Sequence, residues 1–390
     1  MHITVLSDLH LGHKRIPGAH IYQNLQTHVY PTLEHTDLVV FTGDTFHSLL
    51  DFNNDTSGYV IQFLNDLFYM SSVYHFGIRF LRGTFTHDRN QVQYIQQSTH
   101  KFLGDVQDVD LRTYSDIAID EETIHGETLR LLYLPDDLPY RSSDDVLAYV
   151  QQLLDSRGWT DVDIVFGHGY FQHILPPASR GPSVCYTVES FVPICKHLVV
   201  FGHVHTPSIR GYKHLTTLYV GSFERMTHGE EEPKGYITIE TDKWTVTRHV
   251  NLGTLLFLTY SPTADTAEDI VDRFKRWIES AHLSTEKVNY IRVIHPDPSI
   301  RVLLGKILRS EYLQYRCVYS AEAPRSESAA IVETAPITTA DTELVVPTED
   351  NIVEIITQFI KERQLTPLSK ETISSIWQLQ FEEDVRHEYL

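Results

Sequence analysis

Short runs of aliphatic and β-branched residues recur along the first half of the chain, each bounded by glycine or polar residues. Runs of this kind are typical of buried strands. The clearest runs cover residues 3–6, 38–41, 78–81, 162–166 and 198–201. Helical segments are expected between them, around residues 59–69 and 144–156. Alternation of strands and helices predicts an α/β layered domain over residues 1–250.

The pattern changes after residue 205, where strands become short and closely spaced. We expect strands near residues 217–220, 235–240 and 244–250, with turns that contain Gly229 and Pro233. Such spacing indicates antiparallel hairpins that close the sheet.

Residues 251–319 predict a second, smaller unit. Strands are expected at residues 255–260, 290–294 and 316–319, and helices at 267–281 and 300–313. The first helix has apolar residues at helical spacing on one face, namely Ile270, Val271, Phe274, Trp277 and Ile278. This order predicts a small α+β module.

The last part of the chain has two different compositions. Residues 320–347 are rich in Ala, Thr, Ser, Glu and Pro, which predicts a flexible linker. Residues 348–390 follow with two apolar helical stripes, broken near Pro367. A helical hairpin of this size buries too little surface to be stable alone, so it must dock. It docks either on the chain's own core or on a partner, and the linker favours a partner.

Polar residues of a restricted kind follow the predicted strands. They are Asp8 and His10, Asp44, His87 and Asp88, His168, and His203 and His205. Ligands of open α/β sheets bind beyond the carboxyl ends of the strands, so these side chains are expected at one edge of one sheet. Carboxylates and imidazoles gathered in this way predict a two-metal site, which commonly hydrolyses phosphate esters.

The residue types also limit the metal. We assign Asp8, His10, Asp44 and His205 to one ion, and Asp44, His168 and His203 to the other, so that Asp44 bridges. Imidazole and carboxylate without thiolate suit manganese, iron or zinc better than magnesium or calcium. The other histidines, His13 among them, are most simply surface residues.

Composition bounds the remaining possibilities. The formal net charge of −20 disfavours a protein that coats nucleic acid, but it does not exclude a nuclease, because bound cations add local positive charge. The three cysteines show no paired spacing, which is typical of reduced thiols in the cytosol. No apolar stretch is long enough for a membrane helix. Cleavage of a signal peptide would remove Asp8 and His10, so we expect an intracellular, cytoplasmic protein.

The ordered motifs resemble those of the calcineurin-like metallophosphoesterase superfamily over residues 3–225. The resemblance implies a two-sheet α-β-β-α sandwich with a dinuclear metal centre. The third motif of that family is Gly-Asn-His-Asp or Glu, in which the Asn binds the second metal and the His acts on the leaving oxygen. Here His87 and Asp88 match, but Thr86 stands in place of the Asn. Either Thr86 binds weakly or a water replaces it, which makes Thr86 a doubtful ligand.

One further histidine, His47, makes the resemblance more specific, to one group within the superfamily. Residues 43–47 read Gly-Asp-Thr-Phe-His, which is similar to SbcD-type nuclease subunits of double-strand-break repair complexes, where such a histidine, here His47, lies beside the catalytic one. The order of nuclease core, capping module, linker and helical element also matches. The resemblance implies DNA as substrate, two divalent ions with Mn²⁺ expected, a homodimer, and an SMC-like SbcC-type ATPase bound through residues 348–390. The short capping module and tail look like viral members, which act in the host cytoplasm.

The resemblance leads to a mechanistic hypothesis, metal-assisted phosphodiester hydrolysis. His87 would act as general acid or charge stabiliser, Asp88 would orient it by a hydrogen bond, and His47 would support it or contact the phosphate. Two alternatives stay open. One is a phosphomonoesterase or cyclic-nucleotide phosphodiesterase that acts on small substrates, and the other is a non-catalytic scaffold of the same fold.

Overall fold

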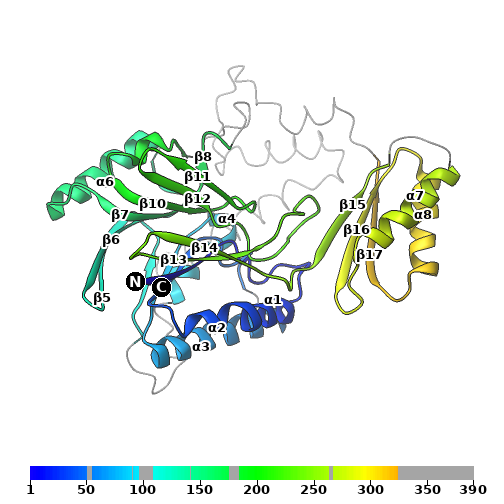
Figure 1. The fold of residues 1–390 in the computed structure, drawn as a ribbon, viewed down its shortest axis with the longest axis horizontal. Coiled ribbons are helices and arrows are strands. Elements are labelled where there is room, and N and C mark those ends of the chain that lie inside the picture. Colours follow the sequence, from blue (N-terminus) through cyan, green and yellow to red (C-terminus); the bar gives the residue numbers. More distant parts are fainter. Residues whose placement is uncertain are drawn as a thin grey trace, which may run out of the picture. The chain divides into compact units, whose positions relative to one another are not determined.

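The computed structural model describes residues 1–50, 55–89, 91–95, 109–140, 142–174, 184–262 and 267–323 (Figure 1). All of them belong to one compact unit, Met1–Ala330. Of the tail predictions, the hairpin at 348–390 and almost all of the linker at 320–347 lie outside the described residues. None of the described helices is long and apolar enough to cross a membrane.

The first six-stranded sheet has the order β14-β13-β1-β2-β3-β4. Its four parallel strands are β1 (His2–Leu6), β2 (Leu38–Thr42), β3 (Gly77–Leu81) and β4 (Leu111–Tyr114). The hairpin of β13 (Gly235–Glu240) and β14 (Thr245–Val250) extends the sheet antiparallel to β1. The aliphatic runs predicted from the sequence form the centre of this sheet because strands buried on both faces carry continuous apolar sequence.

The second six-stranded sheet has the order β11-β12-β10-β7-β6-β5. Its strands are β5 (Ala118–Ile124), β6 (Glu127–Leu134), β7 (Val162–His168), β10 (Cys195–Gly202), β11 (Ser208–Tyr212) and β12 (Leu215–Tyr219). Strands β6, β7, β10 and β12 run parallel. The strand predicted near residues 217–220 does belong to an antiparallel hairpin, that of β11 and β12, but this hairpin lies at the edge of the second sheet, where β12 also pairs parallel to β10. Only β13 and β14 close the first sheet.

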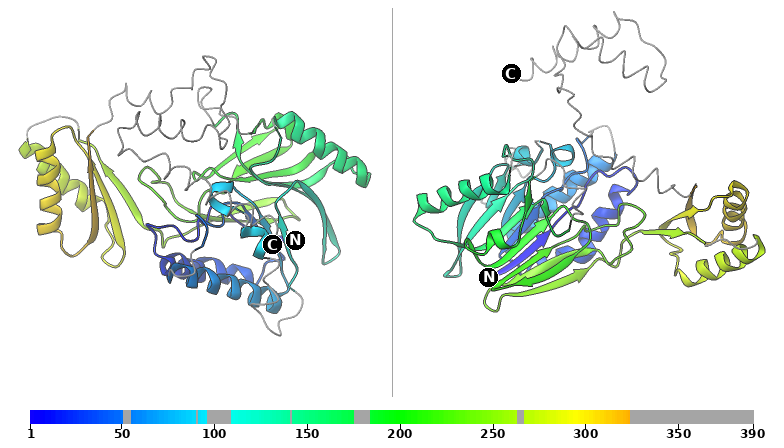
Figure 2. Two further views of the ribbon diagram at one scale, coloured as in Figure 1. Left: turned by 180° about the vertical axis from the view of Figure 1, so that it is seen from behind. Right: turned by 90° about the horizontal axis from the view of Figure 1, so that it is seen from above.

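The two sheets pack face to face, with helices on both outer faces (Figure 1 and Figure 2). The core between the sheets contains side chains of both, such as Val5, Val40, Phe166 and Val200. Helices α1 (Gly18–Asn24), α2 (Tyr30–Leu33) and α3 (Asp55–Tyr74) cover the first sheet, and α6 (Ser143–Arg157) covers the second. This is the expected α-β-β-α sandwich. The predicted site strands, however, do not belong to one sheet, since β1, β2 and β3 lie in one and β7 and β10 in the other.

Residues 256–322 form a three-stranded parallel sheet with two helices. The strands are β15 (Leu256–Tyr260), β16 (Val288–Ile294) and β17 (Arg316–Glu322), and the helices are α7 (Ala267–Ser280) and α8 (Pro298–Glu311). Ile270, Phe274 and Ile278 of α7 pack on Ile291 and Leu304, as the apolar stripe predicted. Strand β17 extends to Glu322, two residues past the predicted start of the linker. The shorter elements of the whole unit are the π-helical turn η1 (Leu25–Val29), α4 (Phe85–Asp88), η3 (Glu189–Phe191), β8 (Tyr170–Phe171) and β9 (Cys185–Tyr186).

Candidate metal centre

The candidate ligands lie at the carboxyl ends of parallel strands in both sheets. Asp8 and His10 follow β1, Asp44 follows β2, His168 is the last residue of β7, and His203 and His205 follow β10. The loops after β1 and β2 are joined by main-chain hydrogen bonds, from Asp8 N to Gly43 O (3.1 Å) and from His10 N to Asp44 O (3.0 Å). His203 N donates to both carboxylate oxygens of Asp8, at 3.1 Å each. These bonds connect the loops of the two sheets around a common centre.

The backbone at this centre adopts conformations that L residues rarely visit. The φ angles of Asp8, His10, Asp44 and His203 are +48°, +45°, +48° and +87°. Positive φ outside glycine costs free energy, and it occurs in tight turns and where the surrounding structure holds a side chain in place. The centre is also crowded at Gly43, where a Cβ would lie 2.2 Å from Nδ1 of His168. The ligand residues therefore adopt strained backbone angles, and position 43 has no side chain, so that these groups can lie close together.

The ligand atoms form two adjacent groups, one of Asp8, His10 and His205 and one of Asp44, His168 and His203. In the first, Nε2 of His10 and Nε2 of His205 are 3.1 Å apart. In the second, Nε2 of His168 lies 3.1 Å from Nδ1 of His203 and 3.4 Å from Oδ2 of Asp44.

Asp44 stands between the two groups. Its Oδ2 is 3.9 Å from Nε2 of His10 in the first group and 3.4 Å from Nε2 of His168 in the second. One carboxylate oxygen thus faces imidazoles of both groups. This is the position that the sequence analysis assigns to a bridging ligand.

Hydrogen bonds from the outside fix two of the imidazole rings. Nδ1 of His168 donates to Thr42 O (2.7 Å), and Nδ1 of His205 lies 3.1 Å from Oε1 of Glu230. A proton on Nδ1 leaves the lone pair on Nε2, the atom that faces the other ligands in both residues. Although burial favours the neutral acid, His205 and the buried amine of Lys234 hold the pKa of Glu230 at about 2, so Glu230 is an anionic acceptor.

Burial and mutual charge shift the pKa values of the centre. Burial raises the pKa of the Asp8 carboxyl. Burial also acts against a charged His168, but the charge and hydrogen bond of Asp44 outweigh it and raise the pKa of His168 to about 10. Burial and the charge of His168 lower the pKa of His203 to about 4. A divalent cation would supply the positive charge that these carboxylates otherwise draw from a proton on His168.

The donor set and its spacing fit two divalent ions. Two ligands that bind one ion at about 2.0–2.2 Å stand roughly 3.0–3.5 Å apart. The measured separations within the groups, 3.1 and 3.4 Å, lie in this range, and the 3.9 Å from Asp8 Oδ1 to His205 Nε2 is slightly longer. Nitrogen and oxygen donors without thiolate suit manganese, iron or zinc.

His87 lies on the short helix α4 beside the first group. Its ring centroid is 4.6 Å from that of His10, and its Nδ1 donates to His47 O (2.8 Å), so Nε2 is the nitrogen left for proton transfer. His47 also places its ring 5.3 Å from that of His87. His13, expected at the surface, is partly buried with its ring 4.4 Å from that of His47.

Asp88 does not orient His87 as predicted. It is fully buried, and its two oxygens accept from Phe46 N (2.9 Å) and Gly83 N (2.7 Å). The reason is geometric: α4 is a single turn, and successive side chains on a helix point in different directions. Asp88 therefore connects the loops after β2 and β3.

Thr84, and not Thr86, contacts the second group. Thr86 is exposed, whereas Oγ1 of Thr84 lies 3.2 Å from Nδ1 of His203 and 3.4 Å from Oδ2 of Asp44. Counted back from His87, the equivalent of the family's Asn is Thr86. Counting forward from Gly83 would have found Thr84, because the Asn follows the glycine in the family motif.

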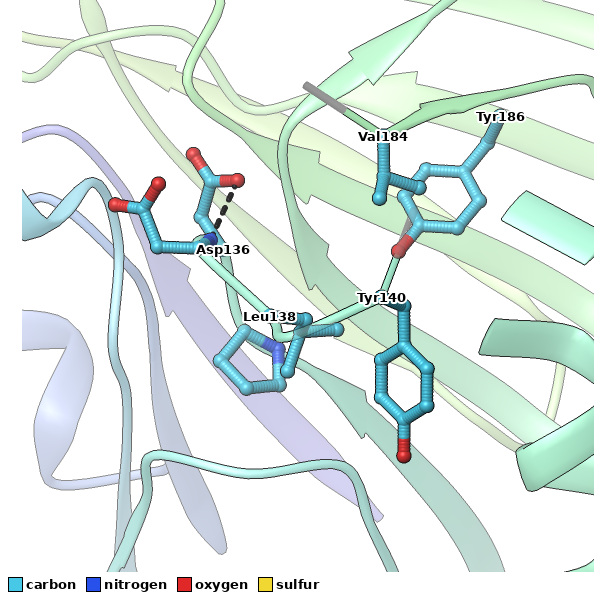
Figure 3. Close-up of a pocket in the computed structure, with 7 residues that line it drawn as sticks. Asp136, Leu138, Tyr140, Val184 and Tyr186 are labelled. Carbon is cyan, nitrogen blue, oxygen red and sulfur yellow. Dashed lines mark hydrogen bonds between the residues drawn. The ribbon is translucent and has the colours of Figure 1, made fainter. Parts of the chain in front are cut away.

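Asp136 and Glu230 are two further residues that sequence reasoning missed. Asp136 follows β6 and carries no recognisable motif, but its Oδ2 lies 3.5 Å from Oγ1 of Thr84. It also lines a pocket of about 220 Å³. Figure 3 shows Asp136 on one side of this pocket and Tyr140 and Tyr186 on the other. The pocket therefore begins beside the second ligand group.

The profile of a family described as "Calcineurin-like phosphoesterase" matches residues 1–207, more than half of the 390 residues. No curated protein matches the chain. Among solved structures, the chain is similar to a novel archaeal phosphodiesterase at 13% identity, with 64% of this chain and 99% of that chain covered and a TM-score of 0.32. Vps29 of Entamoeba histolytica complexed with Zn²⁺ is similar at 12% identity, with 62% and 86% covered and a TM-score of 0.25.

Proposed function

The chain belongs to the calcineurin-like phosphoesterase family, and we propose that it is a DNA nuclease of the SbcD type that uses two divalent ions, most simply Mn²⁺. The observation that carries this proposal is the pair of adjacent ligand groups, with Asp44 facing imidazoles of both and His87 beside them. This arrangement supports hydrolysis of a phosphate ester, which is the chemistry expected of such paired sites.

The chain's own residues have distinct parts in the proposed reaction. Bound ions would neutralise phosphate charge and lower the pKa of the attacking water. Asp8, Asp44 and the ligand histidines would hold them. His87, fixed by its hydrogen bond to His47 O, would give a proton from Nε2 to the leaving oxygen.

The surroundings of the site favour a nucleotide chain as the substrate. Tyr140, which is partly buried, lines the adjacent pocket, and Phe85 on α4 is half exposed. Aromatic side chains of this kind stack on bases, with a contribution of about 1–3 kcal/mol per base. Lys14 and Arg15, both exposed in the loop after His10, supply positive charge for the phosphate backbone.

The partners remain those implied by the sequence. We propose that residues 348–390 bind an SMC-like ATPase of the SbcC type, that the chain forms a homodimer, and that the assembly processes DNA ends in the cytoplasm for recombination and repair. The resemblance in domain order supports this part of the proposal. Phosphodiesterase action on small nucleotides is the second candidate, because the same pocket would accept one nucleotide.

A nuclease assay tests the proposal. The purified chain, with and without a co-purified ATPase, is given end-labelled duplex and single-stranded DNA in Mn²⁺, and in parallel an aryl phosphate monoester. We expect cleavage of DNA that EDTA abolishes and slower turnover of the monoester. His87→Ala should abolish cleavage and keep both ions bound. Preference for the monoester would favour the small-substrate alternative, and a chain that binds no metal would favour the scaffold.

A further inference from the structure

We propose that Asp136 is a ligand of the second ion and compensates for the neutral Thr84 at the position where the family has an amide. This inference rests on the two-ion site of the proposed function. The geometry points to Oδ2 of Asp136, which lies 3.9 Å from Nδ1 of His203 and 3.5 Å from Oγ1 of Thr84. Asp136 stands outside the tight group of Asp44, His168 and His203 and borders it through these two atoms, since Oγ1 of Thr84 is also 3.4 Å from Oδ2 of Asp44. A small turn of the carboxylate toward His203 would bring Oδ2 to the ion.

The loop that carries Asp136 is fastened to the segment that carries Thr84. Asp136 N donates to Arg82 O (3.2 Å), and Nη2 of Arg82 donates to Asp136 O (2.9 Å). Asp137 adds a further connection, because its carboxylate accepts from Phe85 N. Residues 82–85 and 136–137 therefore hold one fixed geometry, and the position of the Asp136 carboxylate does not depend on a free loop.

The two oxygens of Asp136 have different surroundings. Oδ1 accepts from Asp137 N (2.9 Å), which orients the carboxylate. Oδ2 is the oxygen directed to His203 and Thr84. The side chain is 21% exposed, so its charge is less screened by water than that of a surface carboxylate. An oriented and partly buried carboxylate oxygen is suited to bind a divalent cation.

The charge of the second ligand group also favours Asp136 as a ligand. Without Asp136 the second group has one carboxylate, Asp44, which also faces His10 of the first group. A hydroxyl such as that of Thr84 brings no negative charge to a dication, and it is a weaker ligand than an anionic oxygen. Asp136 supplies that charge and would restore the affinity lost with the amide.

Metal binding by three variants tests the proposal without reference to catalysis. The metal-free full chain is titrated with Mn²⁺, and bound ions are counted by elemental analysis while paired ions are detected by electron paramagnetic resonance. Wild type should bind two ions as a pair. Asp136→Ala should keep the first ion and bind the second at least roughly tenfold more weakly, with loss of the paired signal. Addition of Thr84→Asn to Asp136→Ala should restore the second ion.

Asp137→Asn is the matched control, because it removes a charge from the same loop and keeps an oxygen that can accept from Phe85 N. It should bind two ions like wild type. Unchanged binding of the second ion in Asp136→Ala would overturn the proposal. So would a loss that Asp137→Asn shares and Thr84→Asn does not restore, since that result would assign Asp136 to loop structure or to base recognition in the pocket. Two ions that depend on Asp136 without any DNA cleavage would support the ligand and reject the nuclease.

Discussion

At the residue scale, the orientation of His205 depends on a side chain that is no ligand. Glu230 accepts from Nδ1 of His205 at 3.1 Å, and Lys234 lies 2.9 Å from the other oxygen of Glu230. The Lys234 side chain has no exposed surface, and its amine also donates to His205 O (3.1 Å). A buried ammonium needs such partners because the loss of water is otherwise too costly. The three residues therefore form one unit that sets the direction of Nε2 of His205.

Replacement of Glu230 by alanine should weaken binding of the first ion by roughly 10–100-fold, since His205 loses the acceptor that fixes its ring. Glu230→Gln is the control, because an amide oxygen can still accept from Nδ1, and its loss should be smaller. Titration of the metal-free chain with Mn²⁺ measures both. Equal affinities for wild type and Glu230→Ala would show that His205 keeps its direction without this bond.

The residues of the centre differ in how far the sequence identifies them. Six ligand residues could be identified because a carboxylate or imidazole side chain comes at the end of a recognisable aliphatic run. They are Asp8, His10, Asp44, His168, His203 and His205. Thr84 directly follows the glycine of the third motif and was missed in the count, whereas Asp136 and Glu230 reach the centre only through tertiary folding, from loops with no pattern of their own. The hydrogen bond assigned to Asp88 and His87 was wrong for the same reason, because adjacency in sequence does not fix which way a side chain points.

At the element scale, the two sheets are joined by a cluster of charged residues around the buried side chains of Arg79 and Glu122, as well as by apolar contacts. The guanidinium of Arg79 on β3 has no exposed surface, and it lies 2.6 Å from Oε1 of Glu122 on β5 and 2.6 Å from Oδ2 of Asp110. Arg112 on β4 also reaches Glu122, at 3.2 Å. The cluster links the first sheet to the second away from the predicted ligands.

Arg79→Leu should lower the free energy of unfolding by about 3–5 kcal/mol near neutral pH, because it leaves Glu122 buried without its main partner. Burial already outweighs Arg79 and raises the pKa of Glu122 above its usual value, so the folded chain binds this proton more tightly than the unfolded chain. The contribution of Glu122 to stability therefore falls as pH rises above about 4.5. Removal of Arg79 raises this pKa further, so the loss should be largest near pH 8 and shrink near pH 5.

Urea unfolding of the metal-free chain at several pH values measures this difference. Arg112→Leu is the control, since its side chain is 38% exposed and it should cost much less. A loss in Arg79→Leu that does not vary with pH would contradict the assignment to Glu122.

The strands themselves were predictable, but their partners were not. The runs that form β1, β2, β7 and β10 read alike in the sequence because all are buried on both faces. Which sheet each joins is decided by pairing between distant segments, and no local signal reports it. The strand β12 illustrates this, since its antiparallel hairpin was predicted, but its place in the second sheet, beside the parallel strand β10, was not.

At the scale of the whole molecule, the predicted ligands connect the two sheets. Asp8, His10 and Asp44 come from the first sheet, and His168, His203 and His205 come from the second. Each group contains ligands from both. Ions bound here would link the sheets at the edge where the parallel strands end, and unfolding would have to release them.

Binding of Mn²⁺ should therefore raise the midpoint of thermal unfolding. A ligand that binds only the folded state adds about 2.7 kcal/mol at one hundred times its Kd, and each further tenfold adds roughly 1.4 kcal/mol. The midpoint should increase with the logarithm of Mn²⁺ concentration and return to the metal-free value after chelation with excess EDTA. Differential scanning calorimetry of the full chain measures it.

Asp44→Ala gives the strictest test of this linkage, because Asp44 faces both groups and its loss should remove most of the stabilisation by Mn²⁺. His125→Ala is the control, since His125 is 84% exposed and lies in the turn between β5 and β6. It should keep the full shift, which separates the site from general binding of Mn²⁺ to histidines. If Asp44→Ala gained as much stability from Mn²⁺ as wild type, the ions would bind elsewhere, and the two sheets would not be joined through a shared carboxylate.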